Sequence, residues 1–273
     1  MSHIAVTISA PAEIKDILIA QLADVGYEGF EETADLLVAY IPEADFDENI
    51  LQGLAGSHGL DYTKEKIEQA NWNAVWESNF QPVLVDDFCG IRAGFHAPLG
   101  DAVRHEIVIT PKMSFGTGHH ATTYSVIKLM EDIDFSGKKV FDFGTGTGIL
   151  AILADKLGAA QTDGIDNDTW AVDNAEENVA GNRCRAVRIW QADQLDAVES
   201  GAYDVVLANI NRNILLANMV HMKRILKNHG ILILSGILQE DATAIVQAAT
   251  TAGLKAERKA EREHWLALSF HNS

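Results

Sequence analysis

The sequence is poor in cysteine and has no long apolar run. Cys89 and Cys184 are the only two cysteines among 273 residues, so the chain supplies neither a disulfide framework nor a cysteine cluster for a metal ion. No apolar stretch approaches the roughly 18 residues of a membrane-spanning helix, and the N-terminus lacks a basic segment followed by an apolar one. We therefore expect a cytoplasmic protein with reduced thiols and no membrane partner.

Positive charge is also scarce. Lys and Arg number 21 and Asp and Glu number 39, which gives a formal net charge of −18. Most of such a surface repels phosphate, so we expect no direct nucleic-acid partner. The densest basic stretch, residues 255–262, is interrupted by acidic residues and is expected to be a solvated face. A basic protein, in contrast, would be steered toward this acidic chain.

Two common catalytic signatures are missing. The sequence has no Gly-x-Ser-x-Gly nucleophile elbow, which disfavours a serine hydrolase, and no Gly-Lys-Ser/Thr, which excludes a P-loop. His119 and His120 are neighbours in sequence and do not share a helix face, and no third ligand is spaced to match them. We therefore expect no metal site.

The first 68 residues predict a small α+β domain. Alternating and β-branched residues predict strands, and apolar residues three or four positions apart predict helices. The order strand, helix, strand, strand, helix, strand is that of the split-βαβ, ferredoxin-like motif. Strands are expected at residues 3–9, 27–32, 36–41 and 60–67, and helices at 13–25 and 45–55.

Residues 69–82 predict a short linker helix between two domains. Trp72, Trp76 and Phe80 follow one another at intervals of four residues, which places them on one helix face. An aromatic stripe of this kind usually packs against a neighbouring domain, and direct contact with a substrate is the alternative.

Residues 83–273 predict a doubly wound α/β domain. Strand-like runs alternate with helical patterns, which is typical of a mostly parallel sheet covered by helices on both faces. The last two strand-like runs, 254–261 and 264–271, are joined by a tight connection and predict an antiparallel hairpin at the edge of the sheet. The other strands are expected at 88–94, 106–110, 139–143, 161–165, 187–191, 203–208 and 231–235, and the helices at 119–130, 148–157, 170–180, 212–225 and 239–252.

A glycine-rich loop directly follows one of these strands. In VFDFGTGTG, residues 140–148, Gly144, Gly146 and Gly148 permit a sharp turn and a close approach of the backbone to a ligand. The dinucleotide motif G-x-G-x-x-G needs its third glycine one residue later. Asp142 would also repel a pyrophosphate, whereas it would attract the ammonium and sulfonium groups of S-adenosylmethionine. The loop therefore favours S-adenosylmethionine as the cofactor.

Acidic residues end the next two strands. At the position of Asp166, a carboxylate can accept both ribose hydroxyls of an adenosyl group. An acid at a strand end can instead cap the following helix, a role that suits Asp168 better. Asp193 follows the third strand, where it would read the adenine amino group or simply lie in a turn.

Asn209 ends the fourth strand, where open α/β sheets place their ligands. Methyl transfer is an in-line displacement, so the protein must hold the nucleophile opposite the sulfur. An amine must also be neutral, and the carbonyl oxygen of an amide side chain holds its remaining hydrogens without titrating. Asn209 suits this catalytic role, and an Asx-turn at the strand end is the alternative. Upstream, the threonines and free amides of residues 113–123 would hold the carboxylate of the cofactor.

Four motifs together resemble a specific family, the bacterial ribosomal protein L-eleven methyltransferases of the PrmA type. The order of a small N-terminal domain, an aromatic linker and a catalytic domain is also that of the family. The motifs are FGTGHHATT at 115–123, DFGTGTGILAI at 142–152, GIDND at 164–168 and LANI at 207–210.

The resemblance implies a class I methyltransferase that methylates lysine and α-amino groups of one ribosomal protein and recognises it through the N-terminal domain. It also implies cofactor contacts at Thr123, Gly144, Asp166 and Asn209, with Gly146 in the same loop. The sequence departs from the family after LANI, where NRN at 211–213 replaces small apolar residues. We expect a monomer that acts on a basic ribosomal protein.

Two other functions remain open at this point. A methyltransferase of the same fold can act on another protein, a small molecule or RNA. The N-terminal domain can also be a ribosome- or RNA-binding module joined to an inactive methyltransferase domain. Its strands lack the interleaved basic and aromatic residues that RNA stacking needs, and Asp142, Gly144, Asp166 and Asn209 are intact.

Overall fold

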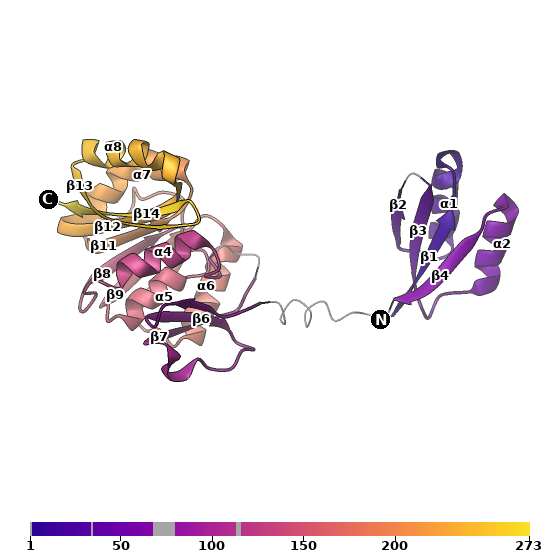
Figure 1. Cartoon of the computed structure of the whole chain (residues 1–273), viewed down its shortest axis with the longest axis horizontal. Coiled ribbons are helices and arrows are strands. Elements are labelled where there is room, and N and C mark those ends of the chain that lie inside the picture. The colour runs from indigo at the N-terminus through magenta and orange to yellow at the C-terminus, as the bar shows by residue number, and fades with distance from the viewer. Residues whose placement is uncertain (1, 34, 68–79, 113–115) are drawn as a thin grey trace. The chain divides into compact units, whose positions relative to one another are not determined.

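The chain divides into two compact units, Met1–Asn79 and Phe80–Ser273 (Figure 1). The structure is a computed structural model and describes residues 2–33, 35–67, 80–112 and 116–273. Trp72, Trp76 and the rest of the predicted linker helix up to residue 79 lie outside the described residues, and residues 80–82 have neither helical nor strand structure. None of the helices in the described part of the chain is long and apolar enough to cross a membrane.

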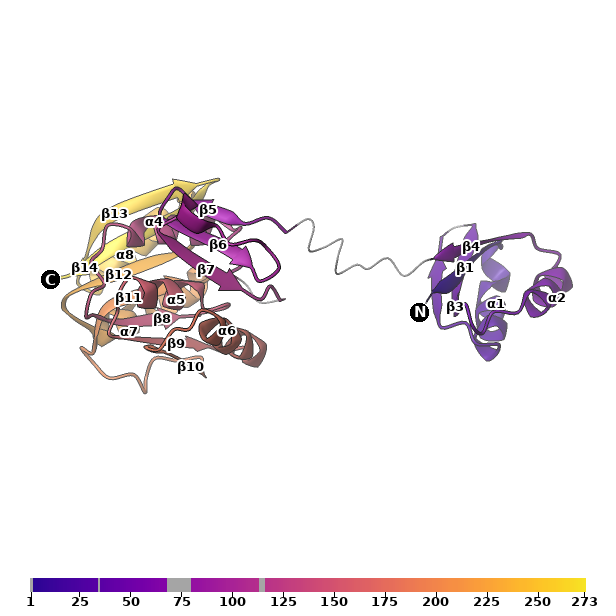
Figure 2. The ribbon, with the colours of Figure 1, turned by 90° about the horizontal axis from the view of Figure 1, so that it is seen from below.

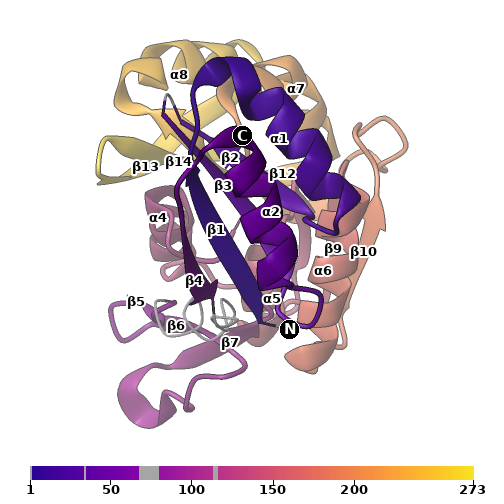
Figure 3. The ribbon, with the colours of Figure 1, turned by 90° about the vertical axis from the view of Figure 1, so that its right-hand side faces the viewer.

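The smaller unit is an antiparallel sheet with two helices on one face. Its strands lie in the order β2-β3-β1-β4, and β1 pairs antiparallel with both β3 and β4. Leu18 and Leu22 of α1 and Leu51 of α2 are buried in one cluster with Val6 and Leu37 of the sheet, so both helices cover the same face (Figure 3). The elements are β1 (His3–Ser9), α1 (Ala12–Asp24), β2 (Gly29–Glu32), β3 (Leu36–Pro42), α2 (Glu48–His58) and β4 (Tyr62–Ile67).

The second helix of this unit begins three residues later than the sequence pattern predicts. The side chain of Asp47 accepts a hydrogen bond from the amide of Asn49, which makes Asp47 the N-cap. Gly59 ends the helix in the left-handed conformation at φ 64°. The predicted bounds of 45–55 were wrong because the two capping residues, and not the apolar spacing, set the ends of α2.

The larger unit is built on a seven-stranded sheet in the order β10-β9-β8-β11-β12-β14-β13. The first five strands are parallel, and β14 runs antiparallel to β12 and β13. The predicted doubly wound sheet with an antiparallel C-terminal hairpin is therefore confirmed. The strands are β8 (Lys139–Phe143), β9 (Gln161–Asp166), β10 (Val187–Gln191), β11 (Tyr203–Asn209), β12 (Leu226–Leu238), β13 (Leu254–Arg262) and β14 (Trp265–Asn272).

Helices cover both faces of this sheet. Along β11, Val205 and Leu207 belong to one buried cluster, while Val206 and Ala208 belong to another, as the alternation of side chains in a strand requires. The first cluster includes residues of α4 and α5, and the second includes residues of α7 and α8. The helices are α4 (Ala121–Met130), α5 (Ile149–Lys156), α6 (Thr169–Gly181), α7 (Arg212–Ile225) and α8 (Ala242–Thr251), with short 3-10 helices at Gly100–Ala102 and Gln239–Asp241.

A separate three-stranded sheet precedes α4. It consists of β5 (Val83–Val85), β6 (Cys89–Ala93) and β7 (His105–Ile109), and it packs beside α4, α5 and α6 (Figure 2). The sequence pattern predicts β6 and β7 but not β5, because three residues are too few to establish an alternation. The β6 and β7 strands are parallel, and β5 is antiparallel to β6.

Candidate functional site

A cavity of about 450 Å³ lies at the carboxyl ends of β8, β9 and β11. Open α/β sheets bind ligands at this edge, and the volume is that of a small-molecule site. The cavity is lined by all five residues that the sequence analysis assigns to the cofactor: Thr123, Gly144, Gly146, Asp166 and Asn209. Residues that are far apart in sequence are thus brought together around one space.

The glycine loop has the backbone conformation that its sequence predicts. Gly144, Gly146 and Gly148 have φ values of 74°, 55° and 80°, a region that side chains strongly disfavour. At Gly144, a Cβ atom would also lie 2.2 Å from Cγ2 of Ile210. Only glycine therefore lets this loop pass so close to the chain that follows β11.

Asp166 holds the glycine loop to the end of β9. Its Oδ2 accepts a hydrogen bond from the amide of Gly146 at 2.9 Å, and its Oδ1 accepts one from the amide of Asp168 at 3.1 Å. Asp168 in turn caps α6 by accepting from the amide of Trp170. A carboxylate has about four acceptor sites, so Asp166 keeps acceptor capacity for two hydroxyl groups of a ligand in the cavity.

Asp142 lies behind the loop and not on the cavity wall. Its side chain is buried, and Oδ2 accepts a hydrogen bond from the hydroxyl of Thr145 at 2.7 Å. Burial, together with the nearby negative charge of Asp166, raises the pKa of the Asp142 carboxyl to about 7. Any attraction that Asp142 exerts on a cationic ligand therefore acts across the loop and without direct contact.

Asn209 lines the cavity and carries an acceptor without a partner. Its Nδ2 donates to Oγ1 of Thr123 at 3.3 Å, and its Oδ1 is buried with no hydrogen-bond partner in the described part of the chain. Leaving a buried polar atom unpaired is costly, so this oxygen is a candidate acceptor for a donor group of a ligand. The Asx-turn alternative does not apply, because neither Oδ1 nor Nδ2 of Asn209 bonds to the local backbone among the hydrogen bonds described.

The departure from the family pattern at residues 211–213 has a structural explanation. Oδ1 of Asn211 accepts the amide of Ile214, so Asn211 is the N-cap of α7. The guanidinium of Arg212 pairs with Asp241 at 2.9 Å. These polar residues serve to start α7 and hold it to the next helical segment.

A bulge in β12 makes room for Ile210. Gly236 has a φ of 87°, and a Cβ atom there would lie 2.0 Å from the backbone oxygen of Ile210. The pairing register between β12 and β14 shifts between Leu234 and Ile237 at the same place. Ile210 is therefore held between Gly144 and Gly236, which fixes the backbone beside Asn209. A glycine inside a strand pattern was the available signal for this bulge.

The backbone amides of Thr122 and Thr123 in the first turn of α4 are already hydrogen-bonded to His120. Nδ1 of His120 accepts the amide of Thr122, and the backbone oxygen of His120 accepts the amide of Thr123. These two amides are thus not available for a carboxylate, which leaves the hydroxyl of Thr123 facing the cavity. The neighbouring His119 contacts the backbone oxygen of Gln81 at 2.9 Å, so the two histidines point to different surroundings.

His120 and Trp265 add an aromatic wall that the sequence analysis missed. Both residues line the cavity, and their ring centroids are 4.7 Å apart in an edge-on arrangement. Trp265 is the first residue of β14, and only the pairing of β14 with β12 brings it here. No local sequence signal predicts a contact across 145 residues.

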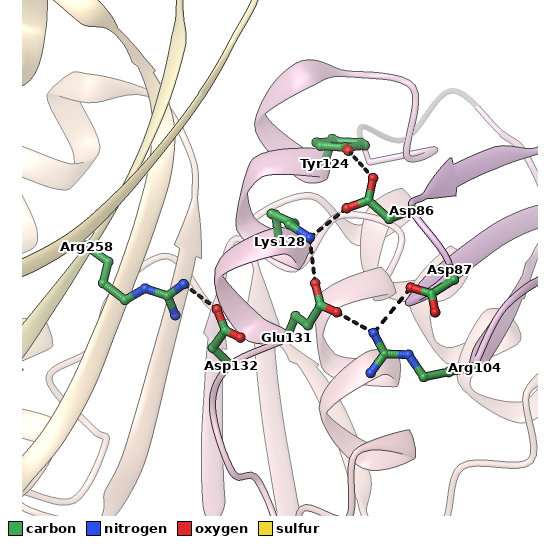
Figure 4. A network of polar contacts seen from close by, with 8 residues as sticks. All are labelled: Asp86, Asp87, Arg104, Tyr124, Lys128, Glu131, Asp132 and Arg258. Atoms are coloured by element: carbon green, nitrogen blue, oxygen red, sulfur yellow. Dashed lines mark hydrogen bonds and ion pairs between the residues drawn. The ribbon is translucent and has the colours of Figure 1, made fainter.

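A network of charges holds α4 in place (Figure 4). Lys128 of α4 pairs with Asp86 at 2.6 Å and with Glu131 at 2.7 Å, and Glu131 also pairs with Arg104. The turn between β5 and β6 carries Asp86, so the network joins this turn to the helix whose first turn contains Thr123. Arg258 of β13, the first strand of the carboxyl-terminal hairpin, forms a separate ion pair with Asp132 in the loop after α4.

The two thiols and the acidic groups of the described residues form no second candidate site. Cys89 and Cys184 are free, and burial raises the pKa of each thiol to about 12, so neither is a reactive thiolate. Within the residues that the structure describes, no three His, Cys, Asp or Glu side chains are grouped as metal ligands.

Comparison with known proteins places the whole chain in one family. The family model described as ribosomal protein L11 methyltransferase (PrmA) matches residues 4–273. The L11 methyltransferase of Porphyromonas gingivalis is 40% identical over 261 residues, which cover 93% of this chain and 90% of that protein. That of Chlorobaculum tepidum is 39% identical and covers 88% of this chain and 86% of that protein.

A solved structure agrees with these relatives. The crystal structure of a ribosomal protein L11 methylase from Lactobacillus delbrueckii subsp. bulgaricus is similar to this chain with a TM-score of 0.65 and 27% identity, and the match covers 71% of this chain and all of that one. The cavity, the glycine loop and the sequence matches lead to the same conclusion. The chain belongs to the ribosomal protein L11 methyltransferase family.

Proposed function

We propose that this chain transfers methyl groups from S-adenosylmethionine to lysine and α-amino groups of ribosomal protein L11. The proposal is supported by relatives that match more than four fifths of the chain and are named ribosomal protein L11 methyltransferases. The observation that carries the proposal is the buried Oδ1 of Asn209, which has no partner in the described residues and lines a cavity next to Asp166.

The residues of the cavity fit S-adenosylmethionine. Asp166 retains acceptor capacity for the two ribose hydroxyls, and Asp193, which also lines the cavity, is positioned to accept from the adenine amino group. The positive φ values of Gly144 and Gly146 let the loop turn sharply at the wall of the cavity. When bound, S-adenosylmethionine supplies a methyl group attached to a positively charged sulfur.

Asn209 is assigned the catalytic role of orienting the amine. A lysine amine has an ordinary pKa near 10.4, so it must lose a proton to water before it can attack. Oδ1 of Asn209 then accepts one remaining N–H of the amine, while Nδ2 stays on Thr123. This hydrogen bond would orient the amine without placing a titrating group beside it.

The smaller unit is proposed to recognise L11. Its helices cover one face of the sheet, and the other face carries Tyr40 between Glu31 and Glu65. Burial, a hydrogen bond with Glu31 and the charge of Glu65 raise the pKa of Tyr40. An acidic, partly aromatic face suits a basic partner, and the net charge of −18 adds long-range attraction. We propose that the chain acts as a cytoplasmic monomer on this basic protein and does not bind nucleic acid directly.

The proposal is tested with labelled S-adenosylmethionine. The chain is incubated with ribosomal proteins from a strain that lacks its gene, and labelled proteins are identified by mass spectrometry. Label on L11 at amino groups is expected. Label on no ribosomal protein would favour a methyltransferase that acts on a small molecule.

A further inference from the structure

Three asparagines form a row along α6. Asn174, Asn178 and Asn182 are four residues apart, so they lie on one face of the helix. Asn174 and Asn178 are buried. The proposed mechanism uses none of the three, and buried amide side chains need a reason to be there.

The side chains of this row bond to the edge of β7 that has no neighbouring strand in the described sheets. Oδ1 of Asn182 accepts the amide of Val108 at 2.9 Å, and Oδ1 of Asn178 accepts the amide of Thr110 at 2.7 Å. Nδ2 of Asn174 donates to the backbone oxygen of Thr110 at 3.1 Å. β6 is the only strand paired with β7 in the described sheets, so the asparagine side chains satisfy backbone groups on its other edge.

Asn178 differs from the other two because it also reaches the glycine loop. Its Nδ2 donates to the backbone oxygen of Thr147 at 2.9 Å. The hydroxyl of Thr147 donates to the backbone oxygen of Gly116 at 2.6 Å, and Thr147 and Gly116 both line the cavity. A Cβ atom at Gly116 would lie 2.9 Å from that hydroxyl, so the contact is close. Thr147 is thus held from both sides.

We propose that Asn178 is a positioning residue for the cofactor site. One amide group bonds to the end of β7 through Thr110 and to the glycine loop through Thr147, so it sets the spacing between β7 and the loop that lines the cavity. A buried side chain whose donor and acceptor are both paired has one orientation. It therefore fixes the positions of the backbone groups to which it is bonded. The inference rests on the proposal that this cavity binds S-adenosylmethionine.

The test compares two isosteric substitutions in the same row. Asn178→Asp keeps the oxygen that accepts from the amide of Thr110. It replaces the nitrogen that donates to the backbone oxygen of Thr147 with a second oxygen, which repels that oxygen. Asn182→Asp likewise keeps its acceptor for Val108 and loses its donor bonds to the backbone, but it does not touch the loop. Calorimetry measures the Kd for S-adenosylmethionine, and thermal unfolding measures the midpoint for each full-length variant.

Asn178→Asp is expected to raise the Kd for S-adenosylmethionine about tenfold or more, while Asn182→Asp changes it less than about threefold, even where both lower the unfolding midpoint. The KM for S-adenosylmethionine should rise in the first variant while the KM for L11 stays the same. Equal affinities in the two variants would overturn the positioning role and leave only a structural one.

A second variant covers the case in which Asn178→Asp fails to fold. Asn178→Ser introduces no charge and shortens the side chain, so it cannot bond to both Thr110 and Thr147 and should raise the same Kd severalfold. An unchanged Kd in this variant would also overturn the proposal. If the unmodified chain itself does not bind S-adenosylmethionine, the proposed function fails, which separates that outcome from failure of the Asn178 role.

Discussion

The two units of the chain differ in how they arrange their polar side chains. In the larger unit, Gly144, Asp166 and Asn209 come from three strand ends and surround one cavity. In the smaller unit, Glu31 and Glu65 are spread across a sheet face beside Tyr40. Parallel strands bring all their carboxyl ends to one edge, whereas antiparallel strands divide them between two edges. The larger unit is therefore suited to enclose a small molecule and the smaller one to contact a protein surface.

The largest effect should come from the amide that faces the cavity. Asn209→Ala removes the acceptor for the amine, so kcat should fall about 100-fold or more, as for other groups that orient a reacting atom. The Kd for S-adenosylmethionine should stay within about threefold, since Asp166 and the loop are intact. Steady-state kinetics and calorimetry measure the two quantities. If the variant keeps the kcat of the unmodified chain, Asn209 has no part in the reaction.

Asp166→Ala should weaken binding of S-adenosylmethionine by a factor of ten or more. A charge-assisted hydrogen bond contributes about 1.5–3 kcal/mol, and the loop amide of Gly146 also loses its partner. Asp168→Ala is the control, because it removes the cap of α6, at a cost of about 1 kcal/mol in stability, and leaves Asp166 in place. Calorimetry of both variants should separate them, and equal affinities would place Asp166 outside the binding site.

Asp142 should make the stability of the larger unit depend on pH. Its pKa is raised from an ordinary value near 4 to about 7, so the folded protein keeps a proton that the unfolded chain has lost between these values. The free energy of unfolding should therefore fall as pH rises from about 4 to 7 and then level off. Urea titrations at pH 5 and pH 8 measure this decrease in the free energy of unfolding. In Asp142→Asn the decrease should be smaller than in the unmodified chain by about 1 kcal/mol or more. Parallel pH profiles for the two proteins would contradict the burial argument.

The smallest effect should come from the sheet face of the smaller unit. Reversing charge in the double variant E31K/E65K should raise the KM for L11 severalfold and leave the Kd for S-adenosylmethionine unchanged, because steering charges act on association. Glu32→Lys is a matched control for the single variant E31K, because it makes the same charge change and Glu32 is exposed on the same strand with its side chain on the opposite face. The difference should shrink at high salt. An equal effect of E32K would indicate net charge alone and not this face.

Sequence patterns located regular elements in both units. The predicted bounds of β1, β8, β10 and α7 agree with the structure residue for residue. The pattern failed for β5, which is too short to alternate, and for α2, whose ends depend on Asp47 and Gly59. An apolar spacing repeated over several residues marks an element by itself, while caps and short strands depend on single residues.

The candidate site was predictable where a strand ends in a glycine or an acid. Gly144, Asp166 and Asn209 each stand at the end of a predicted strand, so their place at the sheet edge follows from the order of the elements alone. The contact of Trp265 with the cavity was not predictable, because it depends on the pairing of β12 with β14. Such pairing joins distant parts of the chain and leaves no local pattern.

By itself, the sequence determined the doubly wound fold, the glycine loop and the strand-end side chains, because periodicity, glycine and charge act within a few residues of one another. Only the tertiary structure decided that Asp142 supports the loop from behind, that Oδ1 of Asn209 has no partner in the described residues, and that Asn178 joins β7 to Thr147. These facts depend on which polar atoms meet across the fold. Hydrogen bonds require distances that no sequence pattern specifies.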